Sequence, residues 1–355
     1  MRKISIIGNF DMNNNSYNGQ TIKTRIVADE LESLYGASEI KRVDTAGGKS
    51  VVLRLLFQLF GCVARSRNVI ILPAQNGIKV ILPLVVIYNL LFSRRIHYVV
   101  IGGWLAELLG RNRWLLCFAK RLHMIYPETK NMKDSLAGLG LHRVVVMPNC
   151  KPLRILTSDE LSGYNLRPMR FCIFSRITPT KGIEDAIKAV NLANEKAGKT
   201  IATLDMYGNV EACDRPWFDA VKASMPETVA YWGRVEFDKS VFKLKEYTAL
   251  LFPTYYPGEG LAGTVIDAFA AGLPIIASDW HDNANIITDN KNGFIFPTRD
   301  VNRLAEIILD IYKCQDRLVP MKLNCIQSAQ AFLPSVVIRT IAKEIASCIL
   351  PVFIK

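Results

Sequence analysis

Short hydrophobic runs alternate with amphipathic stretches along most of the chain. In the first half, six runs have strand character, at residues 3–8, 41–46, 68–74, 96–103, 123–128 and 143–149. Between them, apolar residues recur three or four positions apart, as over residues 21–34, and this spacing predicts helices. A second series of strand-like runs follows at residues 170–177, 202–209, 229–235, 248–256 and 274–280, again with intervening helices such as 182–197.

This alternation predicts an α/β protein with two parallel sheets and right-handed crossovers. The polar segment around residues 156–168, "LTSDELSGYNLRP", predicts a linker. We therefore expect a Rossmann-like N-terminal domain over 1–150, a linker over 151–168 and a second Rossmann-like domain over 169–332. We expect the two doubly wound domains to face each other across a cleft. Ligands of such sheets bind beyond the carboxyl ends of the strands.

Composition limits the function classes. The chain has 355 residues, half of them hydrophobic, which suits two domains with full cores. Eight cysteines without a CxxC pair indicate reduced thiols and a cytoplasmic protein. Four isolated histidines give no metal-ligand spacing, so we predict no metal site. No signal peptide is visible, and the longest apolar run, 78–92, is interrupted by polar residues, which favours a buried or interfacial helix over a membrane span.

Charge is distributed unevenly between the two halves. Residues 1–154 hold 22 Lys and Arg against 9 Asp and Glu, a formal balance of +13, whereas the remainder has a balance of −1. The basic half has either a solvated cationic surface or a surface that faces an anionic partner. The segment 49–67 combines an apolar side with Lys49, Arg54, Arg65 and Arg67. It predicts either a helix packed on its own sheet or contact with an anionic membrane.

Polar residues follow several strands of the second half. In "FSRITPTKG", Arg176 ends a strand and Lys181 precedes a helix. Two cations at one sheet edge suit a diphosphate, although surface charges at a turn are the simpler explanation when this motif is taken alone.

A second motif strengthens the first. In "LLFPTYYPGEGLAGTVIDAFAAG", a buried strand turns at Pro257-Gly258, and Glu259 follows in the loop. The small residues from Gly260 to Gly263 bring backbone N–H groups to the start of a helix, where an anion binds favourably. Thr264 adds a hydroxyl donor. One turn further, Asp267 could accept hydrogen bonds from ribose hydroxyls, while Glu259 accepts them from a second group, an arrangement that suits a sugar nucleotide. The alternative is a Gly-containing turn with a solvated Glu and a surface Asp.

These residues resemble the retaining glycosyltransferases of family 4, which have the GT-B fold. The resemblance covers about residues 165–350. It rests on Ser175-Arg176 with Lys181-Gly182, Tyr207-Gly208, and Tyr231-Trp232-Gly233-Arg234-Val235. The core motif is matched by Glu259-Gly260, Asp267-Ala268, Ala270, Gly272, Pro274 and Ile276-Ala277, followed by Asn292-Gly293. The first half is similar more loosely, through a loop that ends at Gly19 and through "MPN" at 147–149.

Two positions depart from the family pattern. The second acidic residue is Asp267 where Glu is usual, which shortens the side chain by about 1.5 Å. A His common near the donor sugar is replaced by Gly102-Gly103-Trp104. Trp104 could stack on a sugar or belong to the core. Glu128, after another strand, could line the cleft or cap the next helix.

The resemblance implies a metal-independent, retaining transfer of a sugar from a nucleoside diphosphate, UDP most commonly, without a cofactor. Glu259, Arg176 and Lys181 would act in catalysis, with the two cations stabilising the departing diphosphate. Glu259 would hold sugar hydroxyls and not act as a nucleophile. The donor would be held by Gly19, Gln20, Gly208, Asn209, Arg234, Val235, Gly260, Leu261, Ala262, Gly263, Thr264, Val265 and Asp267.

Trp104 and Glu128 would bind the acceptor, a glycan or a polyprenyl-diphosphate-linked glycan of bacterial surface polysaccharide synthesis. The resemblance also implies a final helix, within 333–355, that crosses back to the first domain. With the basic half, these implications predict a peripheral protein on an anionic membrane, and no nucleic-acid partner.

Three alternatives remain. A nucleotide-sugar epimerase of similar fold would not need a basic membrane-facing half. An NAD-dependent oxidoreductase is disfavoured, because the first strand is not followed by GxGxxG. A non-catalytic sugar-nucleotide-binding subunit of an assembly complex is compatible with the Asp267 departure.

Overall fold

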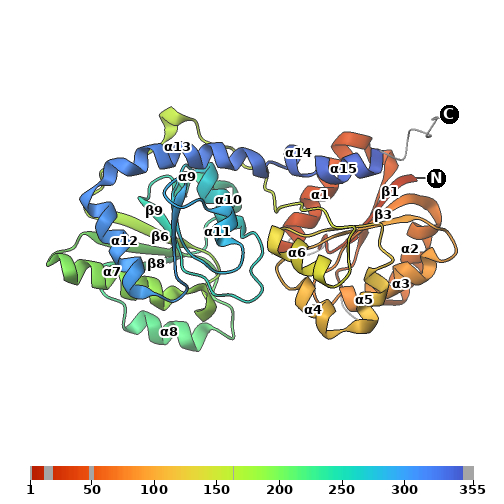
Figure 1. Cartoon of the computed structure of the whole chain (residues 1–355), viewed down its shortest axis with the longest axis horizontal. Helices are drawn as coiled ribbons and strands as arrows, with labels where there is room; N and C mark the ends of the chain where they lie inside the picture. Colours follow the sequence, from red (N-terminus) through yellow and green to blue (C-terminus); the bar gives the residue numbers. More distant parts are fainter. Residues whose placement is uncertain (1, 12–18, 48–51, 163, 347–355) are drawn as a thin grey trace. The chain divides into compact units, whose positions relative to one another are not determined.

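A computed structural model describes residues 2–11, 19–47, 52–162 and 164–346 of the chain. It divides the chain into two compact α/β units (Figure 1). The first unit comprises Met1–Pro152 together with Phe332–Lys355, and the second comprises Leu153–Ala331. The first unit is therefore built from two segments that are far apart in the sequence.

The described part of the first unit contains a parallel sheet with strand order β2-β1-β3-β4-β5. Its strands are β1 (Arg2–Gly8), β2 (Ile40–Asp44), β3 (Ser66–Leu72), β4 (Arg95–Val99) and β5 (Met124–Tyr126). Ile4, Ile6 and Ile7 of β1 are fully buried. A near-continuous apolar run of this kind is expected for a strand that helices cover on both faces.

Helices surround this sheet. They are α1 (Gly19–Tyr35), α2 (Val52–Arg65), α3 (Ile78–Asn89), α4 (Leu105–Arg111), α5 (Arg113–Ala119), α6 (Lys130–Gly138), α14 (Pro334–Val337) and α15 (Arg339–Ala346). The last two come from the end of the chain and join the core of β1 and α1, where Ile338, Ile341 and Ile345 are fully buried.

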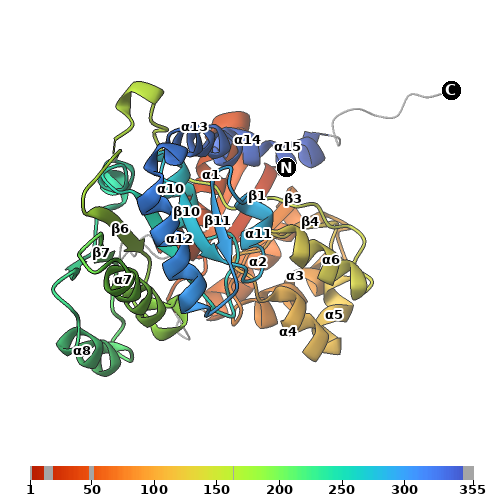
Figure 2. The same cartoon turned by 60° about the vertical axis from the view of Figure 1, so that its left-hand side comes forward.

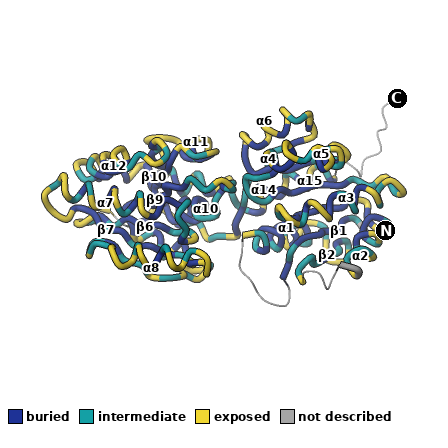
Figure 3. The backbone as a smooth tube through the Cα atoms, turned by 90° about the horizontal axis from the view of Figure 1, so that it is seen from below, coloured by how far each residue is buried: buried dark blue, intermediate teal, exposed yellow. Residues whose placement is uncertain are grey.

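The second unit contains a parallel sheet, for which the described residues give the order β11-β10-β9-β6-β7-β8. Its strands are β6 (Met169–Phe174), β7 (Ala202–Tyr207), β8 (Val229–Gly233), β9 (Ala249–Phe252), β10 (Ile275–Ser278) and β11 (Gly293–Phe296). Figure 3 shows that the strands are buried and that exposed positions lie on the surrounding helices and loops.

The helices of the second unit are α7 (Ile183–Ala197), α8 (Arg215–Ala223), α9 (Ser240–Leu244), α10 (Gly263–Ala270), α11 (Asn283–Ile286), α12 (Val301–Lys313) and α13 (Leu318–Ala329). α7 and α12 pack together over the core of the sheet, and α10 packs against α9 and α13. Both strand orders switch direction beside the strand that begins each sheet, as in doubly wound folds.

The predicted fold class, with two Rossmann-like parallel sheets, is confirmed. Two strand predictions were wrong. Residues 143–149 form no strand, and only Val144 makes an isolated bridge, to Ile125. In the second unit, β11 was missed. The final helix predicted within residues 333–355 is divided into α14 and α15, and residues 347–355 lie outside the described residues.

Candidate functional site

The carboxyl ends of β6, β7 and β8 meet at one edge of the second sheet. The strand registers pair Phe174 with Tyr207 and Tyr207 with Gly233, so the loops after these residues are neighbours. Strand β9 runs parallel to β6, which brings the loop after Phe252 to the same edge. Parallel pairing thus gathers the loops that carry the residues predicted for donor binding.

Two glycines allow these loops to approach one another. Gly208 has φ +151°, and a Cβ there would lie 1.6 Å from the carbonyl oxygen of Ser175. Gly182 has φ +72°, and its Cβ would lie 2.1 Å from the carbonyl oxygen of Pro253. Both positions therefore require glycine, because any side chain would collide with backbone in a conformation that is already strained for other residues.

Lys181 and Glu259 form a buried ion pair at this edge. Lys181 Nζ contacts Glu259 Oε2 closely, and the hydroxyl of Thr254 donates to the same oxygen at 2.8 Å. Each charged residue is only 8% exposed. From the sequence, Lys181 and Glu259 were expected to contact different parts of a ligand, whereas in the structure they contact each other. Thr254 was not predicted, since its only signal is its position after a strand.

Arg176 lies beside this pair and is exposed to solvent. Its guanidinium carbon is 5.3 Å from the centre of the Tyr256 ring, and Lys181 Nζ is 5.2 Å from the same ring. The Tyr256 ring is held close to Gly258, where a Cβ would lie only 2.9 Å from it. The two predicted cations therefore both lie near the Tyr256 ring, Arg176 exposed to solvent and Lys181 buried.

Helix α10 begins next to the Glu259 loop without a side-chain cap. Its N-cap is Ala262, which has no side chain that can accept a hydrogen bond. Thr264 Oγ1 is buried and has no hydrogen-bond partner among the residues that the structure describes. A helix start of this kind presents backbone N–H groups and a partial positive charge. The buried hydroxyl of Thr264 adds a donor that no described group of the protein uses.

Asp267 lies one turn into α10 and is only 3% exposed. Its Oδ1 accepts a hydrogen bond of 3.2 Å from the hydroxyl of Ser240, at the start of α9. The surface position that was the alternative to ribose binding is therefore wrong. The contact with ribose stays a prediction, and Ser240 is a neighbour that sequence reasoning missed.

The remaining predicted residues of the second unit lie in the loops after β7 and β8 and at the start of α10. Asn209 is exposed, and its side-chain amide donates to Glu211 at 3.1 Å. After β8, Arg234 is exposed and Val235 half-buried. In the loop before α10, Leu261 is buried, whereas Gly260, Ala262 and Gly263 are half-buried. Val265 is buried in the first turns of α10.

In the first unit, Glu128 is buried and paired with a lysine. Lys23 Nζ lies 2.5 Å from Glu128 Oε1 and also donates to the carbonyl of Val100 at 3.0 Å. Glu128 does not cap the following helix, because the α6 cap is Thr129, whose side chain accepts from the Met132 amide. Lys23 was not predicted, although a lysine inside the apolar stripe of α1 is a signal for a buried partner.

The other first-unit predictions are placed as follows. Gly19 begins α1, and Gln20 Nε2 donates to the Leu72 carbonyl at 3.5 Å. Trp104 precedes α4 and is half-buried, with part of its side chain packed against the hydrophobic core. Within the described residues, no group of three His, Cys, Asp or Glu side chains could hold a metal ion. No described helix is long and apolar enough to cross a membrane.

Solved structures identify the architecture. The chain superposes on Anabaena HepE in complex with UDP with a TM-score of 0.76 at 15% identity, covering 98% of this chain and 100% of that one. It also superposes on a sucrose-phosphate synthase from Thermosynechococcus elongatus with a TM-score of 0.74 at 14% identity, covering 98% and 99% of the two chains. The chain has the GT-B fold.

Within this GT-B chain, residues 160–332 match the family model described as "Glycosyl transferases group 1". The match covers most of the second unit. It includes the Lys181–Glu259 pair, the close approach of Gly208 to the Ser175 carbonyl, and the start of α10. Over these residues the second unit is similar to the glycosyl transferases group 1 family.

Curated relatives of the GT-B chain are also named as glycosyltransferases. The amylovoran biosynthesis glycosyltransferase AmsK of Erwinia amylovora is 27% identical over 204 residues, which are 53% of this chain and 49% of AmsK. A GDP-mannose-dependent phosphatidylinositol monomannoside mannosyltransferase of Mycobacterium tuberculosis is 26% identical over 160 residues, 44% of this chain and 41% of the relative. The chain thus spans about half, or less, of the length of the curated relatives it matches.

Proposed function

We propose that the protein is a retaining glycosyltransferase of family 4. It moves a sugar from a nucleoside-diphosphate sugar to a glycan or lipid-linked glycan acceptor in bacterial polysaccharide synthesis. The match to the glycosyl transferases group 1 family and the relatives' names support sugar transfer. UDP is the favoured nucleotide, because structural neighbours contain UDP and UDP-glucose.

The observation that carries this proposal is the charge arrangement at the edge of the second sheet. An exposed Arg176 and the uncapped start of α10 contribute positive charge near the Glu259 loop, and the ammonium group of Lys181, whose charge Glu259 balances, adds hydrogen-bond donors. The unpartnered hydroxyl of Thr264 faces no described protein acceptor. A diphosphate is the part of the donor that such donors and charges would stabilise, by roughly 1.5–3 kcal/mol for each charge-assisted hydrogen bond.

The Lys181–Glu259 pair suggests how the site is kept ready without a ligand. Each buried charge neutralises the other, which limits the desolvation cost of both. An ammonium group has three donors, so Lys181 can retain Glu259 and still donate to a phosphate oxygen. Glu259 Oε2 already receives Lys181 and Thr254, which leaves Oε1 for hydroxyls of the donor sugar.

The reaction follows from these roles. The bond between the anomeric carbon and the diphosphate oxygen breaks while a bond to the acceptor oxygen forms on the same face. The acceptor proton passes to the departing diphosphate, whose developing charge Arg176, Lys181 and the α10 start stabilise. Glu259 anchors the sugar, and Asp267 holds the ribose. No cofactor or metal takes part in the proposed step.

The first unit binds the acceptor in this proposal. Trp104 is half-buried and offers part of its ring for stacking on a sugar. Glu128 is neutralised by Lys23, which favours a positioning role for Glu128 over direct contact with the acceptor. Gly19 and Gln20, at the start of α1, would approach the donor phosphates.

The test begins with thermal shifts of the full chain in UDP, GDP, ADP and their sugar conjugates. A selective rise with one nucleotide is expected, since ligand binding stabilises the fold by mass action. Arg176→Ala should abolish most of this rise, whereas Arg303→Ala, an exposed residue on α12, should preserve it.

Products are then analysed by NMR. A transferred sugar with the donor's anomeric configuration supports the proposal, and an inverted configuration contradicts the retaining mechanism. Isomerisation of the donor without an acceptor would indicate an epimerase. Selective binding without turnover of any donor and acceptor pair would indicate a non-catalytic subunit.

A further inference from the structure

A cavity of about 630 Å³ opens in the first unit, away from the residues assigned to substrates. Its walls come from the end of α3, the turn between α5 and β5, and the loop after α6. Leu122 precedes β5 and Ser93 precedes β4, so the cavity lies at the amino ends of these parallel strands. Trp104 and Glu128 follow the carboxyl ends. The cavity size is typical of a small-molecule site.

The cavity is lined by unpaired cations. Lys120, Arg121 and Arg143 all line it, and all three are exposed. Among the residues that the structure describes, these three side chains have no ion-pair partner, and the lining includes no Asp or Glu. Lys120 Nζ lies over Gly140 of the opposite wall, 3.5 Å from where a Cβ of that glycine would be. The cavity is therefore complementary to an anion.

A neighbouring histidine is affected by the same positive charge. His123 follows the lining residue Leu122, and burial lowers its pKa. The charges of Arg95 and Arg143 lower that pKa further, while Glu344 acts in the opposite direction. The positive field of this region thus extends beyond the cavity wall.

The rim of the cavity is apolar and open to solvent. Leu90 lines the cavity and is 65% exposed, and Leu91 beside it is 73% exposed. Helix α3, which ends just before them, packs against α2 and α5, and Figure 2 shows α3 and α5 on one side of the unit. On α2, Phe57 is exposed as well. Exposed leucines next to unpaired cations fit the boundary between lipid headgroups and acyl chains.

Helix α2, which the sequence suggested for membrane contact, contributes only part of the exposed apolar surface near the cavity. The apolar side that suggested membrane contact in the sequence is largely core, because Leu59, Cys62 and Val63 are fully buried. Arg94 is also occupied, since its guanidinium donates to the carbonyls of Val63 and Ala64 at 3.3 Å. Lys120, Arg121 and Arg143 of the cavity, by contrast, have no ion-pair partner among the residues that the structure describes, and sequence patterns did not single them out.

We propose that this cavity binds the phosphate headgroup of an anionic phospholipid while Leu90 and Leu91 enter the surrounding bilayer. The site holds the first unit on a membrane surface through contacts separate from the donor and acceptor sites. It goes beyond the proposed sugar transfer, and it can be tested without any sugar substrate.

The test is co-sedimentation of the full chain with vesicles. One set contains phosphatidylcholine alone and the other about one third phosphatidylglycerol. We expect binding to the anionic set, weakening as salt rises. Removing the three charges with Lys120→Gln, Arg121→Gln and Arg143→Gln should lower the partition coefficient about a hundredfold, equivalent to about 1 kcal/mol for each basic side chain.

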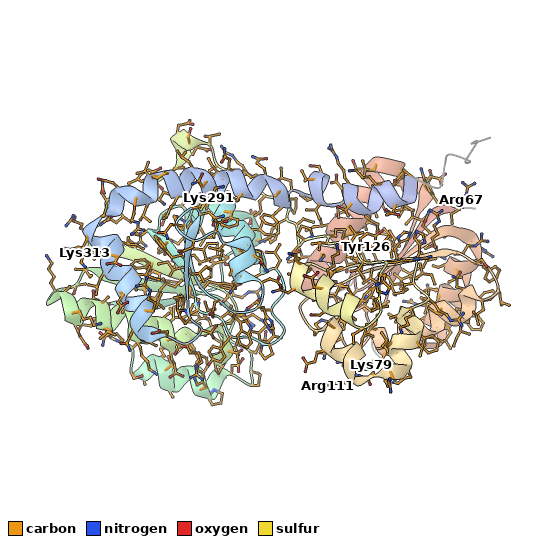
Figure 4. All side chains as sticks on the ribbon, in the orientation of Figure 1. Arg67, Lys79, Arg111, Tyr126, Lys291 and Lys313 are labelled. Carbon is orange, nitrogen blue, oxygen red and sulfur yellow. The ribbon has the colours of Figure 1, made fainter. Side chains whose placement is uncertain are left out.

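A matched control removes three exposed lysines of the second unit, by Lys196→Gln, Lys222→Gln and Lys291→Gln (Lys291 is labelled in Figure 4). This variant has the same net charge as the cavity variant and should bind almost as the unmodified chain does. Equal losses in the two variants, or full binding by the cavity variant, would overturn the proposal. So would equal binding to neutral vesicles.

A second experiment distinguishes binding of a lipid headgroup from binding of free phosphate. Leu90→Gln with Leu91→Gln should reduce vesicle binding while the cavity cations remain. If inorganic phosphate stabilises the chain through these cations but anionic vesicles do not bind, the cavity is a soluble-anion site and the lipid assignment is wrong. Unchanged thermal unfolding of each variant in buffer verifies that the fold is intact.

Discussion

Glu259 shares one carboxylate oxygen between Lys181 and Thr254, whereas Asp267 accepts a hydrogen bond from Ser240 inside the unit. This difference separates their predicted roles. Glu259→Gln should reduce turnover strongly, by about 100-fold or more, because it weakens contact with the transferred sugar in the transition state. Affinity for bare UDP should hardly change.

Asp267→Asn should lower the affinity for UDP and for the full donor together. Titration calorimetry with UDP and with UDP-sugar measures both.

Ser240→Ala is the control for Asp267, because it removes the observed hydrogen bond without touching the carboxylate. If Ser240→Ala lowers the affinity for UDP as much as Asp267→Asn does, the aspartate affects binding through local packing and not through a hydrogen bond to ribose. A Glu259→Gln variant that loses UDP affinity to the same extent as Asp267→Asn would contradict the division of labour between the two carboxylates.

Gly208 supports the site through its backbone. Replacing it by Ala should lower the free energy of unfolding by about 3 kcal/mol or more, because φ +151° is a region used almost only by glycine and the new Cβ would collide with the Ser175 carbonyl. The control is Gly198→Ala, at a positive φ with open space around it, which should cost about 1 kcal/mol. Urea denaturation compares the two. Equal losses in the free energy of unfolding would show that the close approach of Gly208 to the Ser175 carbonyl adds no constraint.

At the scale of elements, the sheet of the first unit contains a buried histidine. His97 on β4 lies between Tyr126, labelled in Figure 4, at 3.0 Å and Asn68 on β3 at 3.2 Å. Burial lowers the pKa of His97 to about 3, and the positive charges of His123 and Arg95 act in the same direction.

The sign of the pH effect follows from this lowered pKa. Between about pH 3 and 6.5 the unfolded chain binds a proton that the folded chain does not, so stability falls as the pH is lowered through this window. The slope contributed by His97 is at most about 1.4 kcal/mol per pH unit. His97→Gln should flatten the pH dependence of urea unfolding relative to the unmodified chain. A variant with the same slope would show that His97 is protonated in the fold.

Element patterns predicted most of the two sheets, because each central strand is apolar and bounded by turn residues. The prediction failed where the pattern is weak. β11 begins with Gly293 directly after the polar run 289–292, which indicates a turn. Residues 143–149 are apolar but lie beyond the last strand, where just one bridge forms. Because ligands of parallel sheets bind beyond the carboxyl ends of the strands, the sequence pointed to Arg176, Lys181 and Glu259 as candidate site residues. It could not show the pairing of Lys181 with Glu259 or of Lys23 with Glu128, since each pair is created by contacts between distant segments.

At the scale of the whole molecule, the first unit depends on the end of the chain. Ile341 is fully buried among residues of β1 and α1, and Tyr35 donates to the Ala342 carbonyl at 3.0 Å. Ile341→Ala should lower the free energy of unfolding by about 2–5 kcal/mol. Arg339→Ala, at an exposed position of α15, should cost less than about 0.5 kcal/mol.

Limited proteolysis shows which unit is destabilised by this substitution. Cleavage in the Ile341→Ala variant should increase first within residues 19–152, while the second unit remains resistant. Earlier cleavage within 153–331 would show that the last helix stabilises the second unit instead.

The division of the first unit into two segments also has a consequence for the order of folding during synthesis. The ribosome completes all of Leu153–Ala331 before it adds α14 and α15, which at about 5–20 residues per second takes on the order of 10–40 s. Throughout this interval, the apolar surface that will receive Ile338, Ile341 and Ile345 has no partner from its own unit. The nascent chain therefore has a finished second unit beside an incomplete first one, and a chaperone that covers exposed apolar surface would act on the part of the chain that was made first.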